Sequence, residues 1–182
     1  MSNPNCKMAC GSKYAKQDIK DAIDYILRNE AVDEDNIFLL GASGGGHMAL
    51  LIAGMIPEYF KAIAAYVPIT DLRKWKEQNS YYRPHILECC SSEDEMLYRS
   101  PINYVDGISK SNLKIFHGKY DSVVPFSHSL VLFNLIVSQY PTASVYLDIF
   151  DGGHEIDLNT AEYWISSQYN KKELTEVNKC RG

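Results

Sequence analysis

The sequence lacks any long apolar run. None of its hydrophobic stretches reaches the roughly 20 residues that a helix needs to cross a bilayer. Its N-terminal segment contains no apolar core of the kind found in secretory signals. We therefore expect no membrane partner, and we expect a cytoplasmic protein unless a leader precedes the chain.

An excess of positive charge is also missing. The 182 residues include 18 Lys and Arg against 23 Asp and Glu, which gives a formal net charge of -5 and an isoelectric point near 5.5. Such a balance argues against a nucleic-acid-binding surface. Lys171 and Lys172 form only an isolated pair, which we interpret as part of a solvated helix face. We therefore expect no nucleic-acid partner.

Cysteines are few and poorly arranged for disulfides. An odd number that includes an adjacent pair makes a weak disulfide framework, so we expect free thiols in a reducing compartment. Two cysteines near the N-terminus lack a second Cys or His pair at metal-binding spacing, so we expect no metal site. The five are Cys6, Cys10, Cys89, Cys90 and Cys180.

The chain instead shows alternating strand and helix patterns. Hydrophobic residues make up 46% of it, enough for a packed core. The strand at 61–67 is apolar without alternation, which favours a parallel sheet covered on both faces. We predict the α/β class, with strands at 37–40, 61–67, 113–116 and 145–150 and helices at 14–29, 45–56, 127–140 and 160–174.

We predict one domain over 1–182, complete or partial, with residues 71–112 as an excursion. This segment contains several aromatic residues, and we expect one or two short helices placed over the strand ends like a lid. Trp75, Tyr81 and Tyr82 either line a substrate pocket or only pack the excursion down.

A glycine-flanked serine follows the first predicted strand. In Gly41-Ala42-Ser43-Gly44-Gly45 the strand ends at the serine and a helix begins at once, the context of a nucleophile elbow. We expect that a Cβ at Gly41 or Gly45 would press the strand against the helix. We also expect strained backbone at Ser43, and a Gly44 N–H aimed at a developing oxyanion. A phosphate loop is the weaker alternative, because no lysine follows the glycines.

An acid and a histidine follow two later strands. Asp121 comes after the third predicted strand and His154 after the fourth, so both loops leave the same edge of the sheet as Ser43. The chain order Ser, Asp, His is that of nucleophile-elbow hydrolases. His154 is the predicted base for the serine, and Asp121 would orient and stabilise the imidazolium.

Each of these assignments has a structural alternative. Asp121 could cap the helix that follows it, and His154 could be an ordinary surface-loop histidine. Asp71 is the serious competitor among the other acids, because it too follows a strand; the remaining ones are Asp148, Asp151 and Asp157. Four further histidines are expected to be structural or solvent-facing, the last two without an evident partner: His47, His117, His128 and His85.

Four segments together resemble the catalytic domain of the prolyl oligopeptidase (S9) family of serine hydrolases, with related esterases close behind. They are Gly41-Ala42-Ser43-Gly44-Gly45, Ser100-Pro101-Ile102-Asn103-Tyr104, the nine residues 117–125 and Gly152-Gly153-His154. The resemblance implies an α/β-hydrolase fold with Ser43 as nucleophile, Asp121 as acid and His154 as base. It also implies a small peptide or ester substrate and no metal or organic cofactor.

The chain departs from this family pattern at its N-terminal side. Domains of the family have several strands before the first one predicted here, and a turn that completes the oxyanion hole. No such segment precedes Tyr14, so the chain resembles the C-terminal part of a hydrolase domain. A catalytically impaired fragment that serves as a structural or interaction module is therefore the alternative to a working peptidase or esterase.

The missing strands would also leave strand 37–40 at an open edge of the sheet. Exposed apolar edges pair readily with another chain. We expect self-association through this edge, or residues 1–12 folded over it. A monodisperse monomer with an uncovered edge in solution scattering would contradict the expectation.

Overall fold

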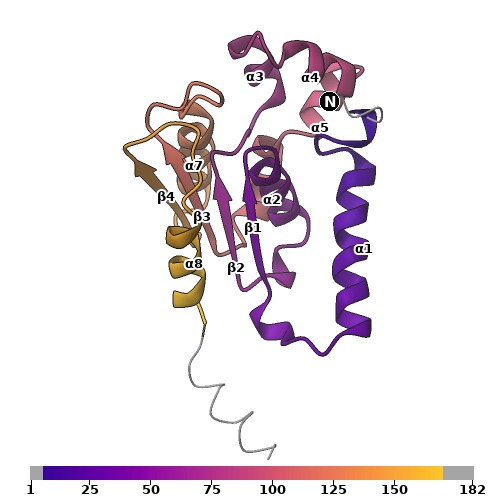
Figure 1. Cartoon of the computed structure of the whole chain (residues 1–182), viewed down its shortest axis with the longest axis vertical. Coiled ribbons are helices and arrows are strands. Elements are labelled where there is room, and N and C mark those ends of the chain that lie inside the picture. The colour runs from indigo at the N-terminus through magenta and orange to yellow at the C-terminus, as the bar shows by residue number, and fades with distance from the viewer. Residues whose placement is uncertain (1–5, 170–182) are drawn as a thin grey trace, which may run out of the picture.

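A parallel sheet forms the centre of the molecule. The computed structural model describes residues 6–169, and within them four strands pair in the order β1-β2-β3-β4. All three pairings are parallel. Figure 1 shows the strands side by side between helices, which confirms the α/β class. The strands are β1 (Phe38–Ala42), β2 (Ala62–Tyr66), β3 (Leu113–Gly118) and β4 (Val145–Phe150).

The four long helices occur where the periodicity predicts them. They are α1 (Lys13–Asn29), α2 (Gly44–Met55), α7 (Ser127–Gln139) and α8 (Leu158–Ser167). The last helix ends at Ser167, short of the predicted range 160–174, of which residues 170–174 lie outside the described residues. Short 3-10 turns occur at η1 (Cys6–Met8), η2 (Glu34–Asn36) and η3 (Pro57–Tyr59). In the described part of the chain, every helix is too short or too polar to cross a membrane.

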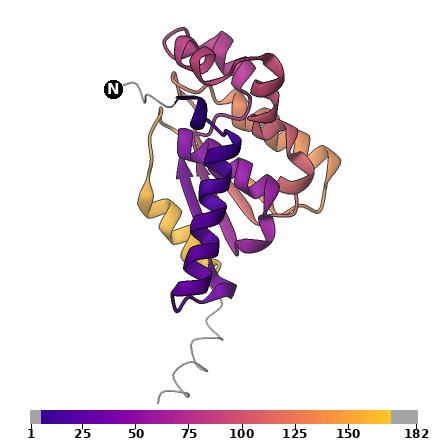
Figure 2. The same ribbon diagram turned by 90° about the vertical axis from the view of Figure 1, so that its right-hand side faces the viewer.

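Alternate residues of the central strand β2 face opposite layers. Ile63 and Ala65 belong to the core that packs on α2 and α7, whereas Ala64 and Tyr66 pack with Phe116 against α8. All five residues of β2 are buried. Because successive side chains of a strand point to opposite faces, continuous burial requires cover on both sides. Figure 2, which views the sheet from its side, shows α8 on the face opposite to α7.

The excursion 71–112 holds more helix than predicted. Its elements are α3 (Leu72–Gln78), α4 (Arg83–Cys89), α5 (Glu93–Tyr98), η4 (Pro101–Asn103) and α6 (Val105–Ile108). The first three lie over the carboxyl ends of the strands (Figure 1) and bury a small core of their own. Side-chain caps from Asp71 and Ser92 start α3 and α5. Such short helices depend on these caps and on tertiary packing, so periodicity alone does not reveal them. A lid-like role for the excursion stays a prediction.

Strand β1 ends the sheet in the described part of the chain. Leu40 in this strand is 42% exposed. Residues 6–12 pack against α1 and α4 at the end of the sheet, not along β1, so this part of the N-terminal segment does not cover the edge. Self-association through residues 37–40 therefore stays a prediction.

The turn between β1 and α2 depends on two glycines, of which the sequence predicts one correctly. A Cβ at Gly41 would lie 2.2 Å from the carbonyl oxygen of Gly45, and one at Gly46 would lie 2.7 Å from the carbonyl oxygen of Tyr66. The expectation for Gly45 is wrong, because a Cβ there would meet nothing within 4 Å. In the first turn of α2, the glycine that packs closely against the end of β2 is Gly46 and not Gly45.

The turn predicts a contrast among three substitutions. Gly41→Ala and Gly46→Ala should each lower the free energy of unfolding by about 1–3 kcal/mol, because the new methyl group meets backbone that must shift. Gly45→Ala is the matched control and should change stability by less than about 1 kcal/mol, in the stabilising direction, because alanine loses less chain entropy. Urea unfolding followed by circular dichroism measures all three. Equal losses in the three variants would contradict this account of the turn.

Candidate active site

Ser43 lies at the apex of the turn between β1 and α2. Its φ of 54° and ψ of -116° place a non-glycine residue in sparsely populated backbone space, as the sequence predicts. Two backbone bonds hold this conformation: the Ser43 N–H donates to the Tyr66 carbonyl at 2.9 Å, and the His47 N–H donates to the Ser43 carbonyl at 2.9 Å. Gly44 is the first residue of α2, so its N–H has no acceptor within the helix.

The structure brings Ser43, Asp121 and His154 together. His154 Nε2 lies 2.9 Å from Ser43 Oγ, and His154 Nδ1 lies 2.7 Å from Asp121 Oδ2. An ionised carboxylate only accepts hydrogen bonds, so Nδ1 carries the proton and donates to Asp121. Nε2 is then the acceptor for the Ser43 hydroxyl. The three side chains form one continuous hydrogen-bonded path.

Close contact between two loops places the histidine beside the acid. The Lys119 N–H donates to the Phe150 carbonyl and the Tyr120 N–H donates to the Gly152 carbonyl, both at 2.9 Å. A Cβ at Gly118 would lie only 2.0 Å from the carbonyl oxygen of Gly153. Glycine at 118 therefore lets the loop after β4 lie directly on the loop after β3.

Hydrogen bonds keep Asp121 ionised although it is buried. Its Oδ1 accepts the N–H groups of Val123 at 2.8 Å and Val124 at 2.9 Å, and its Oδ2 faces both His117 and His154. Burial alone would raise the pKa of Asp121. The hydrogen bonds from the two imidazoles and the two backbone N–H groups outweigh burial and lower the pKa to about 2.

His117 is structural, as the sequence suggests, but its contact with Asp121 was not anticipated. The ring is fully buried, with Nδ1 2.6 Å from the Ser129 hydroxyl and Nε2 2.9 Å from the Val124 carbonyl. With Ser129 donating to Nδ1, Nε2 carries the proton and also lies 3.3 Å from Asp121 Oδ2. A histidine four residues before the acid, at the end of a buried strand, is the signal that could have indicated this.

The competing acids have other partners. Asp71 Oδ1 accepts the N–H groups of Arg73 at 2.9 Å and Lys74 at 3.3 Å, so Asp71 caps α3. Helix capping was the structural alternative for Asp121 in the sequence, and here Asp71 has that role. Of the remaining acids, Asp157 caps α8, Asp148 pairs with Lys114 at 2.9 Å, and Asp151 is exposed.

Two further histidines are packed inside the molecule. His47 is 3% exposed and its Nδ1 lies 2.8 Å from the Ile69 carbonyl, in agreement with a structural role. Burial lowers the pKa of His47 to about 4. His128 is also buried, in agreement with a structural role, and it has partners that were not evident from the sequence: its Nδ1 accepts the Thr70 N–H at 3.3 Å and its Nε2 lies 3.0 Å from Gln78 Oε1. Both partners are at least 50 residues away in the sequence, so no local pattern reveals them.

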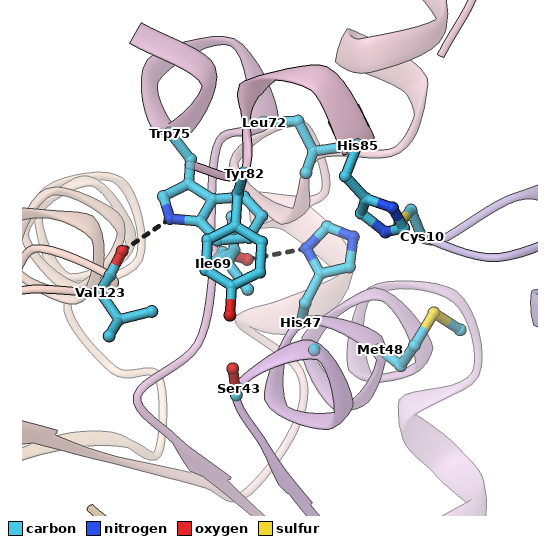
Figure 3. Close-up of a pocket in the computed structure, with 11 residues that line it drawn as sticks. Cys10, Ser43, His47, Met48, Ile69, Leu72, Trp75, Tyr82, His85 and Val123 are labelled. Atoms are coloured by element: carbon cyan, nitrogen blue, oxygen red, sulfur yellow. Dashed lines mark hydrogen bonds between the residues drawn. The ribbon is translucent and has the colours of Figure 1, made fainter. Parts of the chain in front are cut away.

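A cavity of about 320 Å³ opens beside Ser43. Trp75 and Tyr82 stack with ring centroids 5.0 Å apart on its wall, and Figure 3 shows the Tyr82 hydroxyl directed toward Ser43. The Trp75 indole N–H donates to the Val123 carbonyl at 2.9 Å, which ties the wall to the loop of Asp121. Of the three candidate aromatics, only Tyr81 points elsewhere; it is 82% exposed. The remaining lining is mainly apolar and includes Met48, Ile69, Leu72 and Val123.

Sulfur and imidazole groups gather at one side of this cavity. Cys10 Sγ lies 3.6 Å from His85 Nε2 and 3.2 Å from Cys89 Sγ, so His85 has a neighbour that was not evident from the sequence. The expectation of free thiols holds for Cys10 and Cys90 and is wrong for Cys89, which is disulfide-bonded. A count of cysteines cannot show that the N-terminal segment packs on α4.

The same cluster has the spacing of metal ligands. The ligand atoms of Cys10, His85 and Cys89 all lie within 4.8 Å of one another. A metal would need Cys89 as a thiolate, and the disulfide removes that ligand. The absence of a metal site stays a prediction.

Known proteins resemble this chain in sequence. The chain is 28% identical over 158 residues to inactive dipeptidyl peptidase 10 of Mus musculus. This alignment covers 85% of this chain and 19% of that protein. It is 30% identical over 128 residues to the acylamino-acid-releasing enzyme of Homo sapiens, covering 63% of this chain and 17% of the enzyme. The chain thus spans less than a fifth of these relatives.

A solved acylaminoacyl peptidase from Pyrococcus horikoshii has the same fold. It superposes with a TM-score of 0.71 at 21% sequence identity, over 82% of this chain and 25% of the peptidase. The family model described as "Prolyl oligopeptidase family" matches residues 10–175, which is most of the chain and includes the turn at Ser43 and both loops. The chain therefore belongs to the prolyl oligopeptidase family.

Proposed function

We propose that Ser43, His154 and Asp121 form a catalytic triad and that the protein hydrolyses peptide or carboxylic-ester bonds through an acyl-enzyme. Membership in the prolyl oligopeptidase family supports a serine peptidase or esterase domain in general. The observation that carries the specific proposal is the unbroken hydrogen-bonded path from Ser43 Oγ through His154 to Asp121.

The proton path follows from this geometry. Ser43 Oγ attacks the substrate carbonyl carbon while His154 Nε2 takes the hydroxyl proton. The imidazolium is stabilised by Asp121, whose low pKa keeps it charged at neutral pH. His154 then gives the proton to the leaving amine or alcohol as the bond to the carbonyl carbon breaks. A water molecule, activated by the same imidazole, releases the acid and restores Ser43.

The turn offers one hydrogen-bond donor for the oxyanion. The Gly44 N–H lies at the N-terminus of α2, where backbone donors and the helix dipole favour negative charge. Gly44 is exposed, so a substrate can approach this part of the turn. Among the described residues we assign no second donor. In a serine hydrolase the loss of one such donor costs roughly 2.7–4 kcal/mol.

The cavity beside Ser43 favours an apolar substrate group. Its wall of Trp75 and Tyr82, with Leu72 and Val123, presents mostly apolar surface. An apolar side chain or acyl group that fills it would hold the scissile carbonyl at Ser43. The acylamino-acid-releasing enzymes among the relatives make an acylated peptide a reasonable first substrate to test.

A catalytically impaired module is the second candidate function. Two observations favour it: one relative carries the description "inactive", and the oxyanion hole has one assigned donor in the described part of the chain. In that case the domain would keep its fold and its hydrogen-bonded side chains while a complete transition-state site is missing.

Labelling with a fluorophosphonate probe separates the two functions. If Ser43 is an activated nucleophile, the folded protein should gain one phosphonyl group in intact-mass spectrometry, and Ser43→Ala should lose all labelling. Ser122→Ala is the matched control, because Ser122 is an exposed serine on the Asp121 loop, and should label like the wild type. Absence of labelling in protein that unfolds cooperatively would support the impaired module instead.

The low pKa of Asp121 predicts the acid sensitivity of the fold. The carboxyl titrates near 4 in an unfolded chain and at about 2 in the folded protein. Its ionised form therefore stabilises the fold above about pH 4, and the contribution disappears as the pH falls toward about 2. The free energy of unfolding should fall by about 2 kcal/mol more in the wild type than in Asp121→Asn over this range. Urea titrations at several pH values measure it, and parallel curves would contradict it.

A cytoplasmic location stays a prediction. The disulfide at Cys89 weighs against it, because structural disulfides persist mainly in oxidising compartments. Fractionation of cells that produce the protein tests the location, and a secreted pool would contradict it.

A further inference from the structure

The carboxylate of Asp121 has a second imidazole beside it that the proposed proton path does not use. His117 Nε2 lies 3.3 Å from Asp121 Oδ2, the same oxygen that lies 2.7 Å from His154 Nδ1. The side chains of His117 and Asp121 are both fully buried. Burial raises the pKa of Asp121, and the hydrogen bond from His117 is the largest of the effects that lower it. His117 therefore acts on the charge that faces His154.

The surroundings of His117 keep a proton on the nitrogen that faces the acid. Nε2 lies 2.9 Å from the Val124 carbonyl and 3.3 Å from the Asp121 carboxylate, and both of these groups only accept hydrogen bonds. Nδ1 lies 2.6 Å from the Ser129 hydroxyl, which can donate to it. The Nε2–H of His117 is thus shared between the Val124 carbonyl and Asp121 Oδ2.

The His117 ring is fixed by two elements and the loop between them. It belongs to β3, Ser129 belongs to α7, and the Phe126 ring packs against it at an angle of 74° with the centroids 5.8 Å apart. The Val124 N–H donates to Asp121 Oδ1 at 2.9 Å, while the Val124 carbonyl accepts from His117. A donor whose own position is locked by packing and hydrogen bonds can hold a reacting group in place.

We propose that His117 is a positioning residue for the triad, which holds Asp121 Oδ2 toward His154 and keeps the carboxylate from turning. Each oxygen of Asp121 then has two donors: Oδ1 accepts from the N–H groups of Val123 and Val124, and Oδ2 accepts from the two imidazoles. The effect on rate rests on the proposed function. The effect on the His154 ring does not, because it can be measured without hydrolysis.

The rate of fluorophosphonate labelling of Ser43 tests the proposal. His117→Leu removes the donor and should slow labelling at least about tenfold, because a misplaced catalytic group costs rate. His117→Gln carries an amide N–H near the position of Nε2 and should restore most of that rate. Ser129→Ala is the matched control: it disturbs the other side of the same ring, leaves the contact with Asp121 and should label within about threefold of the wild type. No slowing in His117→Leu, slowing that His117→Gln does not relieve, or equal slowing in Ser129→Ala would overturn the proposal.

NMR of the His154 ring tests the contact without any hydrolysis. The proton on His154 Nδ1 should change its resonance in His117→Leu, because the accepting oxygen loses its second donor, and should keep it in Ser129→Ala. His117→Asn serves as a second variant if His117→Leu does not unfold cooperatively, since its amide leaves no donor at the place of Nε2. An unchanged resonance in the folded variant would overturn the proposal.

The two readouts separate this inference from the proposed function. Absence of probe labelling in the wild type would count against the hydrolase, and the NMR result alone would then decide the role of His117. Labelling of the wild type that His117→Leu leaves unchanged would count against His117 only.

Discussion

The hydrogen bond from His154 Nδ1 to Asp121 Oδ2 is the interaction on which the rest of the site depends. It joins the loops after β3 and β4, sets the tautomer of the imidazole and leaves Nε2 to accept from Ser43. The parallel sheet makes this bond possible because the carboxyl ends of its strands lie at one edge. The bare backbone of Gly118 allows the two loops to come close enough.

The same acid links the site to the cavity that would hold the substrate. Val123 donates its N–H to Asp121 and accepts at its carbonyl from both Trp75 Nε1 and Asn79 Nδ2, at 2.9 Å each. The excursion is thus anchored to the loop that carries the acid. A change in the packing of α3 would therefore affect the position of the Asp121 carboxylate, which stabilises His154. Among the described hydrogen bonds, none joins a residue of α3 to Ser43 directly.

Much of this arrangement could be predicted from the sequence, because it follows from local patterns. The strands, the long helices and the serine turn have clear periodicity and glycine signals, and the positions of Ser43, Asp121 and His154 after three strands place them on loops at one edge of the sheet. The pattern could not decide which glycine of the turn is crowded, because that depends on where Gly46 meets the end of β2.

The features that the sequence missed depend on contacts between distant segments. The helices of the excursion are too short to show a periodicity, and the disulfide state of Cys89 depends on packing that no count of cysteines can give. Asp71 and Asp121 look alike in sequence because both follow strands. Only the fold shows that Asp71 accepts from its own helix while Asp121 accepts from two histidines.

Nitrogen-15 NMR of the histidine side chains tests the central claim most directly, because it reports which ring nitrogen of His154 carries the proton. At neutral pH the account predicts a proton on Nδ1, with a strongly downfield N–H resonance that is lost in Asp121→Asn, and an unprotonated Nε2 facing Ser43. A His154 ring protonated on Nε2 alone, or an Nδ1 resonance that Asp121→Asn leaves unchanged, would contradict it.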